Sequence, residues 1–86
     1  QNYPNPFNPE TSIRFTLATG GHTVLEVYNV TGRKAATLVD GFLPAREHTV
    51  TWDGCDDNKQ PLASGVYFYR LDAGDQRASR KMVLLR

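Results

Sequence analysis

A chain of 86 residues, 40% hydrophobic and 22% charged, is long enough for one small domain with a modest core, and its composition is neither disordered nor membrane-spanning. The formal net charge of +1 argues against nucleic acid as the main partner. No apolar run approaches the roughly 20 residues that cross a bilayer, so we expect no membrane insertion. The single cysteine, Cys55, leaves no internal disulfide and no thiolate metal cage.

The first ten residues predict an extended arm. Three prolines fall between Tyr3 and Pro9, and each fixes its own φ and lacks an amide hydrogen. Each also biases the preceding residue toward extended geometry. We therefore expect residues 1–10 to form a stiff arm whose central residues are Tyr3, Pro4, Asn5, Pro6 and Phe7.

The next segments alternate as half-buried strands do. Residues 12–17 place Ile13, Phe15 and Leu17 on one face, and a glycine turn then leads into a strand over 23–30. Gly32 is the natural site for a positive φ in the tight turn that follows. Residues 34–40 resemble a helix by their alanines and a strand by their context, and their short length favours the strand.

The second half of the chain repeats this pattern. A loop over 41–47 is broken by Pro44, residues 48–52 alternate, and the longest polar connection runs to Gly65. The aromatic and β-branched segment 66–73 is a strong strand prediction, and 77–86 is the closing strand. The expected core comprises Phe15, Leu25, Val27, Leu38, Val50, Trp52, Val66 and one face of 66–73.

These elements predict an all-β fold, a small immunoglobulin-like antiparallel β-sandwich of about seven strands without a disulfide. The sandwich is expected to occupy residues 11–86, after the arm of residues 1–10.

Catalytic signatures are missing from the sequence. Ser64 lies in PLASGV, which lacks the first glycine of a nucleophile elbow. His22 and His48 lie in different hairpins and have no zinc-ligand spacing. We therefore expect no enzyme activity and no cofactor.

An acidic turn is a weak candidate for calcium. Its oxygen-bearing side chains are Asp53, Asp56, Asp57 and Asn58. Their spacing is not that of an EF-hand, and Asp and Asn commonly accept hydrogen bonds from nearby backbone amides. The turn interpretation is therefore favoured over the metal site.

Carbohydrate binding is a further alternative, because small β-sandwiches often serve it. A sugar platform needs two or three coplanar aromatic rings on an exposed face. Tyr67 and Tyr69 are two residues apart and are candidates for such a platform, whereas Trp52 is expected in the core.

Five motifs occur in sequence along the chain: the proline arm at Tyr3 to Pro9, the turn at Gly32-Arg33, Trp52-Asp53-Gly54, Ser64-Gly65-Val66-Tyr67, and Lys81-Met82-Val83. In this order they resemble the C-terminal sorting domain of the type IX (Por) secretion system, type A. The related immunoglobulin-like domain of the flagellar hook-capping protein is similar too. The resemblance covers essentially the whole chain.

This resemblance implies a non-catalytic sorting signal at the end of a longer secreted protein. It implies that translocon components carry the upstream cargo from the periplasm across the outer membrane, and that a sortase-like peptidase removes the domain. The expected location is secreted or cell-surface. An ending at Arg86, after KMVLL, fits a natural C-terminus.

The last strand is the expected recognition element, through Lys81, Met82, Val83, Leu84, Leu85 and Arg86. An edge strand that is apolar and basic is available for strand addition to a receptor, or for a weak dimer. An ordinary closing strand that fills the core with Met82 and Leu84, or with Val83 and Leu85, is compatible with this role. The rival interpretation is an immunoglobulin-like structural spacer.

Overall fold

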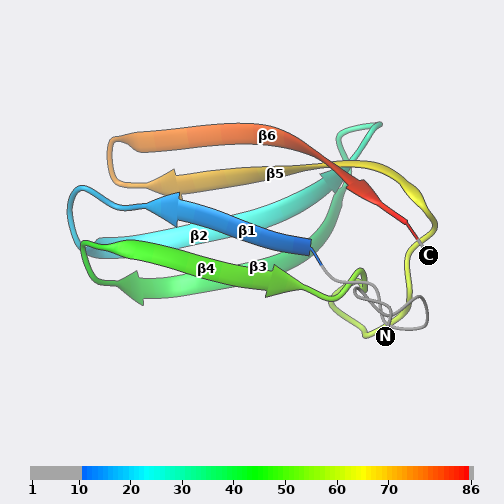
Figure 1. Ribbon diagram of the computed structural model, residues 1–86, viewed down its shortest axis with the longest axis horizontal. Coiled ribbons are helices and arrows are strands. Elements are labelled where there is room, and N and C mark those ends of the chain that lie inside the picture. Colours follow the sequence, from blue (N-terminus) through cyan, green and yellow to red (C-terminus); the bar gives the residue numbers. More distant parts are fainter. Residues whose placement is uncertain (1–10, 86) are drawn as a thin grey trace, which may run out of the picture.

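The computed structural model describes residues 11–85, and within them the chain forms six strands and no helix (Figure 1). The residues of the predicted arm, Tyr3 to Phe7, and the terminal Arg86 lie outside the described residues. The strands are β1 (Thr11–Thr16), β2 (Gly21–Asn29), β3 (Lys34–Leu43), β4 (Glu47–Trp52), β5 (Gly65–Ala73) and β6 (Gln76–Leu84).

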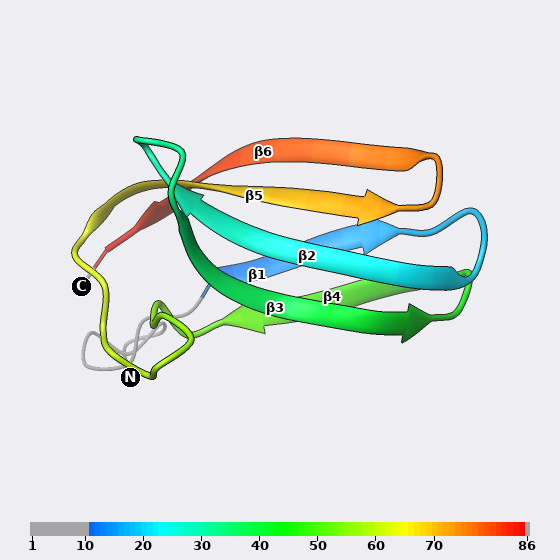
Figure 2. The ribbon, with the colours of Figure 1, turned by 180° about the vertical axis from the view of Figure 1, so that it is seen from behind.

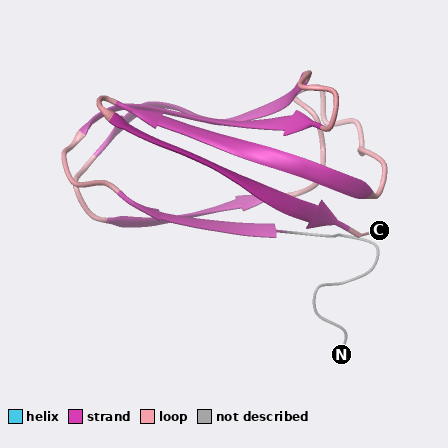
Figure 3. Ribbon diagram, turned by 90° about the horizontal axis from the view of Figure 1, so that it is seen from above, coloured by secondary structure: helices cyan, strands magenta, loops and turns pink. Residues whose placement is uncertain are grey.

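The strands form two antiparallel sheets that pack face to face. One sheet pairs β1 with β4, and the other has the order β3-β2-β5-β6. Figure 3, seen from above, shows them as two layers, and Figure 2 shows the four-stranded sheet in front of the two-stranded one. The predicted all-β sandwich without a disulfide is confirmed, with six strands in residues 11–85.

The core lies between the sheets and follows the alternation of the strands. The buried apolar residues are Ile13, Phe15, Leu17, Leu25, Val27, Ala36, Trp52, Tyr67, Tyr69, Leu71, Met82 and Leu84. Leu38 and Val50, which were expected in the core, are partly buried and pack against it. The prediction for Val66 is wrong, because Tyr67 and Tyr69 take the inward positions of β5 and the pleat turns Val66 outward.

Two local predictions concern the region of β3. Gly32 has a φ of 85°, which confirms the tight turn between β2 and β3. The strand preference for residues 34–40 is also confirmed, but β3 continues through Leu43. It does so because Phe42 and Leu43 pair with His22 and Gly21 of β2, and the loop begins only at Pro44.

Gln76 joins the two sheets where the sandwich is open between β1 and β6. Its side-chain amide nitrogen donates to the Thr16 carbonyl at 2.6 Å, and its amide oxygen accepts from the Ala18 amide at 3.3 Å. One side chain of β6 thus serves backbone groups at the end of β1, which has β4 as its paired strand.

Replacing Gln76 with alanine is expected to lower the free energy of unfolding by about 1–2 kcal/mol, because both backbone groups lose their partner. Urea denaturation followed by circular dichroism measures the change. Gln60→Ala, at an exposed loop position, is the matched control and should have little effect. Equal free energies of unfolding for the two variants would contradict a stabilising role for the two Gln76 hydrogen bonds between the sheets.

Candidate recognition surface

The last strand alternates between core and solvent. Met82 and Leu84 are buried at 7% and 1% exposure, whereas Val83 is 54% exposed and Leu85 is 74% exposed. Of the two arrangements left open by the sequence, the structure therefore has Met82 and Leu84 in the core. Lys81 and Val83 lie on the outer face, so β6 is both an ordinary closing strand and an exposed one.

One edge of β6 has no strand beside it among residues 11–85. The strand pairs with β5 from Gly65↔Leu84 to Ala73↔Gln76, and β6 is last in the order of its sheet. In an antiparallel strand the amides and carbonyls that do not bond one neighbour face the other side. The outer row of β6 backbone groups is therefore positioned to pair with a further strand.

Apolar side chains gather on the outer face beside this edge. Val66 and Phe68 of β5 are each 37% exposed, and Val83 of β6 lies directly across from Val66. A shallow groove of about 340 Å³ continues this surface past Phe68 to Tyr28 and Val30. The sequence did not identify this patch, because aromatic residues occupy both faces of β5.

A group of polar side chains borders the patch on β2 and β5. The Tyr28 hydroxyl donates to a Glu26 carboxylate oxygen at 2.8 Å and accepts from an Arg70 guanidinium nitrogen at 2.9 Å. The Arg70 guanidinium also lies 4.9 Å from the centre of the Tyr28 ring. The hydrogen bond to Glu26, with smaller contributions from burial and from the Glu26 charge, raises the pKa of Tyr28 above 10.0.

The raised pKa of Tyr28 predicts a loss of stability in alkali. The folded state holds the phenolic proton more strongly than the unfolded chain, so this contribution is complete below pH 10.0 and is lost as the pH rises through the raised pKa. Tyr28→Phe should therefore make the alkaline decline shallower. Urea denaturation below and above pH 10.0 tests this, and identical pH profiles for the two proteins would contradict it.

In the acidic loop between β4 and β5, the aspartate carboxylates accept hydrogen bonds from backbone amides. Asp53 accepts from the Cys55 amide at 3.0 Å, and Asp56 accepts from the amides of Asn58 and Gln60 at 2.9 Å each. Asp57 accepts from the Thr37 amide of β3 at 2.9 Å. These contacts match the turn interpretation, and residues 11–85 hold no group of three His, Cys, Asp or Glu placed for a metal ion.

The other candidate residues have structural contacts. Tyr67 and Tyr69 are buried at 7% and 8% exposure and fill the core from the inward face of β5, so the alternative of a sugar platform built from them is wrong. The Tyr67 hydroxyl donates to the Ala63 carbonyl at 2.8 Å. The His48 ring stacks on Phe15 with ring centres 5.4 Å apart. A ring nitrogen of His22 lies 2.9 Å from an Asp40 carboxylate oxygen.

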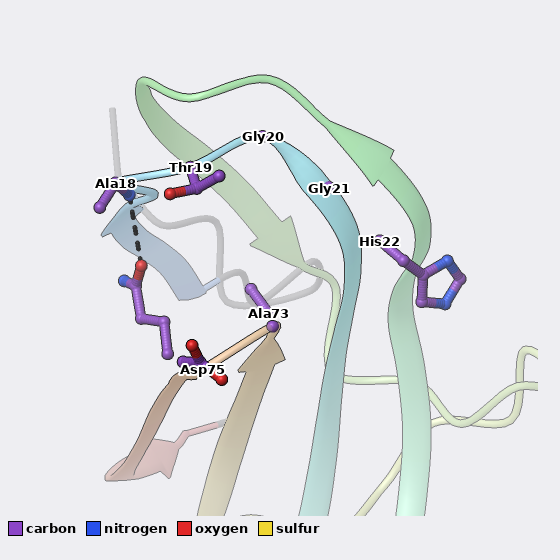
Figure 4. A pocket seen from close by; sticks show the side chains of 9 residues that line it. Ala18, Thr19, Gly20, Gly21, His22, Ala73 and Asp75 are labelled. Atoms are coloured by element: carbon purple, nitrogen blue, oxygen red, sulfur yellow. Dashed lines mark hydrogen bonds between the residues drawn. The ribbon is translucent and has the colours of Figure 1, made fainter.

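A hollow of about 630 Å³ lies at the end of the sandwich where the β1–β2 loop meets the β5–β6 turn (Figure 4). Its lining is mainly small residues, and Asp75 of the turn and Gln76, the first residue of β6, contribute polar side chains. Figure 4 shows His22 pointing away from the hollow.

Comparisons with known proteins agree with the fold. A family model described as the secretion system C-terminal sorting domain matches residues 1–85. FlgD from P. aeruginosa is 16% identical with a TM-score of 0.70, and the match covers 88% of this chain and 60% of that protein. FlgD from Xanthomonas campestris, a protein of flagellar hook capping, is 22% identical with a TM-score of 0.69, over 90% of this chain and 56% of that one. No curated protein matches the chain.

The family match and the two structures confirm the resemblance expected from the sequence motifs. The identities to FlgD are low, so they establish a shared fold, and the chain spans little more than half of each FlgD chain. Residues 11–85 contain no helix that is long and apolar enough to cross a membrane.

Proposed function

This chain belongs to the family of secretion system C-terminal sorting domains, non-catalytic signal domains of the type IX (Por) system, and we propose that the export machinery recognises it through β6. The observation that carries the proposal is the dual character of this strand. Met82 and Leu84 hold β6 in the core, while Lys81, Val83 and Leu85 are exposed beside an edge with no strand of residues 11–85 along it.

The family supports secretion across the outer membrane toward the cell surface. In the proposed route an upstream cargo in the same chain passes through the periplasm, translocon components bind the folded domain, and a sortase-like peptidase then removes it. The proline-rich residues 1–10 act as a spacer between cargo and sandwich, with Tyr3 and Phe7 as its anchors.

Placement within a fusion protein tests the sorting role against the spacer role. Residues 1–86 are attached to a fluorescent carrier with a signal peptide, either after the carrier or between signal peptide and carrier, in a bacterium with a type IX system. We expect the carrier at the surface or in the medium only when the domain is last, because residues following β6 would cover its end.

The alternatives give different results in this assay. Export from both positions would contradict recognition at the end of the chain. Periplasmic retention of both folded fusions would contradict sorting and would support a spacer. Cell fractionation and protease treatment of intact cells locate the carrier, and a carrier without the domain is the control.

A further inference from the structure

The last strand is positively charged in a sheet whose acids already have partners. Residues 76–86 contain basic side chains and no Asp or Glu. Arg80 and Lys81 are exposed and form no ion pair within residues 11–85. Ion pairs engage Glu26 with Lys34 and Arg70, and Asp72 with Arg70 and Arg77. A carboxylate oxygen of Asp40 lies 2.9 Å from a ring nitrogen of His22.

The residues next to the β6 edge define which side chains an added strand would meet. Lys81 lies across from Phe68, and Val83 lies across from Val66. Alternate side chains of an added strand would project over the same outer face. One of them would meet the Lys81 ammonium, and one two positions away would meet the 54% exposed Val83.

A second copy of this chain is a poor occupant of the edge. Antiparallel pairing of two β6 strands about Ser79 would set Arg77 opposite Lys81, and pairing about Arg80 would set two arginines opposite each other. Like charges directly opposite each other destabilise a strand pair. The charge pattern of β6 therefore favours a partner of opposite charge.

We propose that β6 binds an extended acidic segment of a partner protein as an added strand, with a carboxylate at Lys81 and an apolar side chain at Val83. The free edge supplies the backbone hydrogen bonds, and the basic and apolar side chains select the sequence. This inference rests on the proposed function and assigns a chemistry to the partner segment of the export machinery.

A peptide titration tests the proposal on the 86-residue chain. The probe is a short fluorescent peptide in which glutamate and valine lie two positions apart with threonine between them, so that both face the same side, and its counterpart carries lysine in place of glutamate. We expect the acidic peptide alone to bind and Lys81→Glu to weaken it by about tenfold. The same variant should gain affinity for the lysine peptide. Arg46→Glu, an equal charge change at an exposed position between β3 and β4, should leave both affinities unchanged.

Hydrogen exchange identifies the mode of binding. The acidic peptide should slow the exchange of those β6 amides that face away from β5. Three results would overturn the proposal: equal binding of both peptides, an equal loss with Arg46→Glu, or protection of these amides before any peptide is added. In the last case sedimentation distinguishes a second copy from a segment of the chain itself on the edge.

Failure of this inference and failure of the proposed function are distinguishable. If the peptide does not bind but the terminal fusion is exported, the acidic strand is wrong and the sorting role stands. If the peptide binds as expected but the fusion remains periplasmic, the edge binds acidic strands and the proposed route is wrong.

Discussion

Replacing Trp52 with alanine should lower the free energy of unfolding by about 3–5 kcal/mol, a large share of the roughly 5–15 kcal/mol that stabilises a small domain. Trp52 is 1% exposed and meets the Tyr67 ring edge-on at 5.3 Å. Its indole nitrogen also donates to the Cys55 carbonyl at 3.0 Å. The substitution leaves a cavity between the sheets and removes the contact that holds the acidic loop against β4.

Urea denaturation followed by circular dichroism measures this loss without relying on tryptophan fluorescence. Trp52→Phe keeps much of the packing but leaves the Cys55 carbonyl without the indole, so its cost should be about 1–3 kcal/mol. Thr51→Ala, at the exposed neighbouring position, should change stability by less than about 0.5 kcal/mol. A Trp52→Ala variant as stable as Thr51→Ala would show that the core is not centred on this residue.

The double variant Lys81→Glu, Val83→Glu should remain folded and lose at least about nine-tenths of carrier export, because a tenfold change requires only about 1.4 kcal/mol of binding free energy. Both side chains face outward, so Met82 and Leu84 keep the strand in the core. The expected loss comes from repulsion of an acidic partner at one position and from a carboxylate on the apolar contact at the other.

Thr49→Glu with Arg46→Glu is the matched control, since it adds two carboxylates and removes one basic residue at exposed positions near and on β4. Thermal unfolding verifies that both double variants are folded, and cell fractionation measures export. Normal export of the β6 variant, or an equal loss in the β4 control, would contradict recognition through β6.

The sequence predicted the strands whose two faces differ in polarity. Residues 12–17 carry apolar side chains at alternate positions only, and Ile13, Phe15 and Leu17 are all buried. The family motifs were equally predictive, because they extend over the whole chain and are not a single short match. The fold class and the sorting role could therefore be predicted from the sequence alone.

The remaining features depend on contacts distant in sequence. Tyr67, Phe68 and Tyr69 are consecutive aromatic residues, and their order alone does not decide which face is inward. In the structure Tyr67 faces inward and contacts Trp52. Val66 and Phe68 therefore lie on the outer face of β5. The pairing of β2 with β3 shifts register between Leu25 and Glu26, where Leu38 of β3 is passed over, and the alternation of β3 is interrupted there.

The two hydrogen bonds from the Gln76 side chain to the other sheet also could not be predicted from the sequence. Its partners Thr16 and Ala18 are separated from it by 60 and 58 residues, and no local pattern announces their proximity. The outer apolar patch depends on the pairing of β6 with β5, and the Gln76 hydrogen bonds depend on the packing of the two sheets.

Carrier location in matched strains tests the sorting account most directly. A carrier ending in residues 1–86 is expressed in a bacterium with an intact type IX system and in an otherwise identical strain without its translocon. The account predicts carrier at the surface or in the medium of the first strain and in the periplasm of the second. The same location in both strains would contradict it.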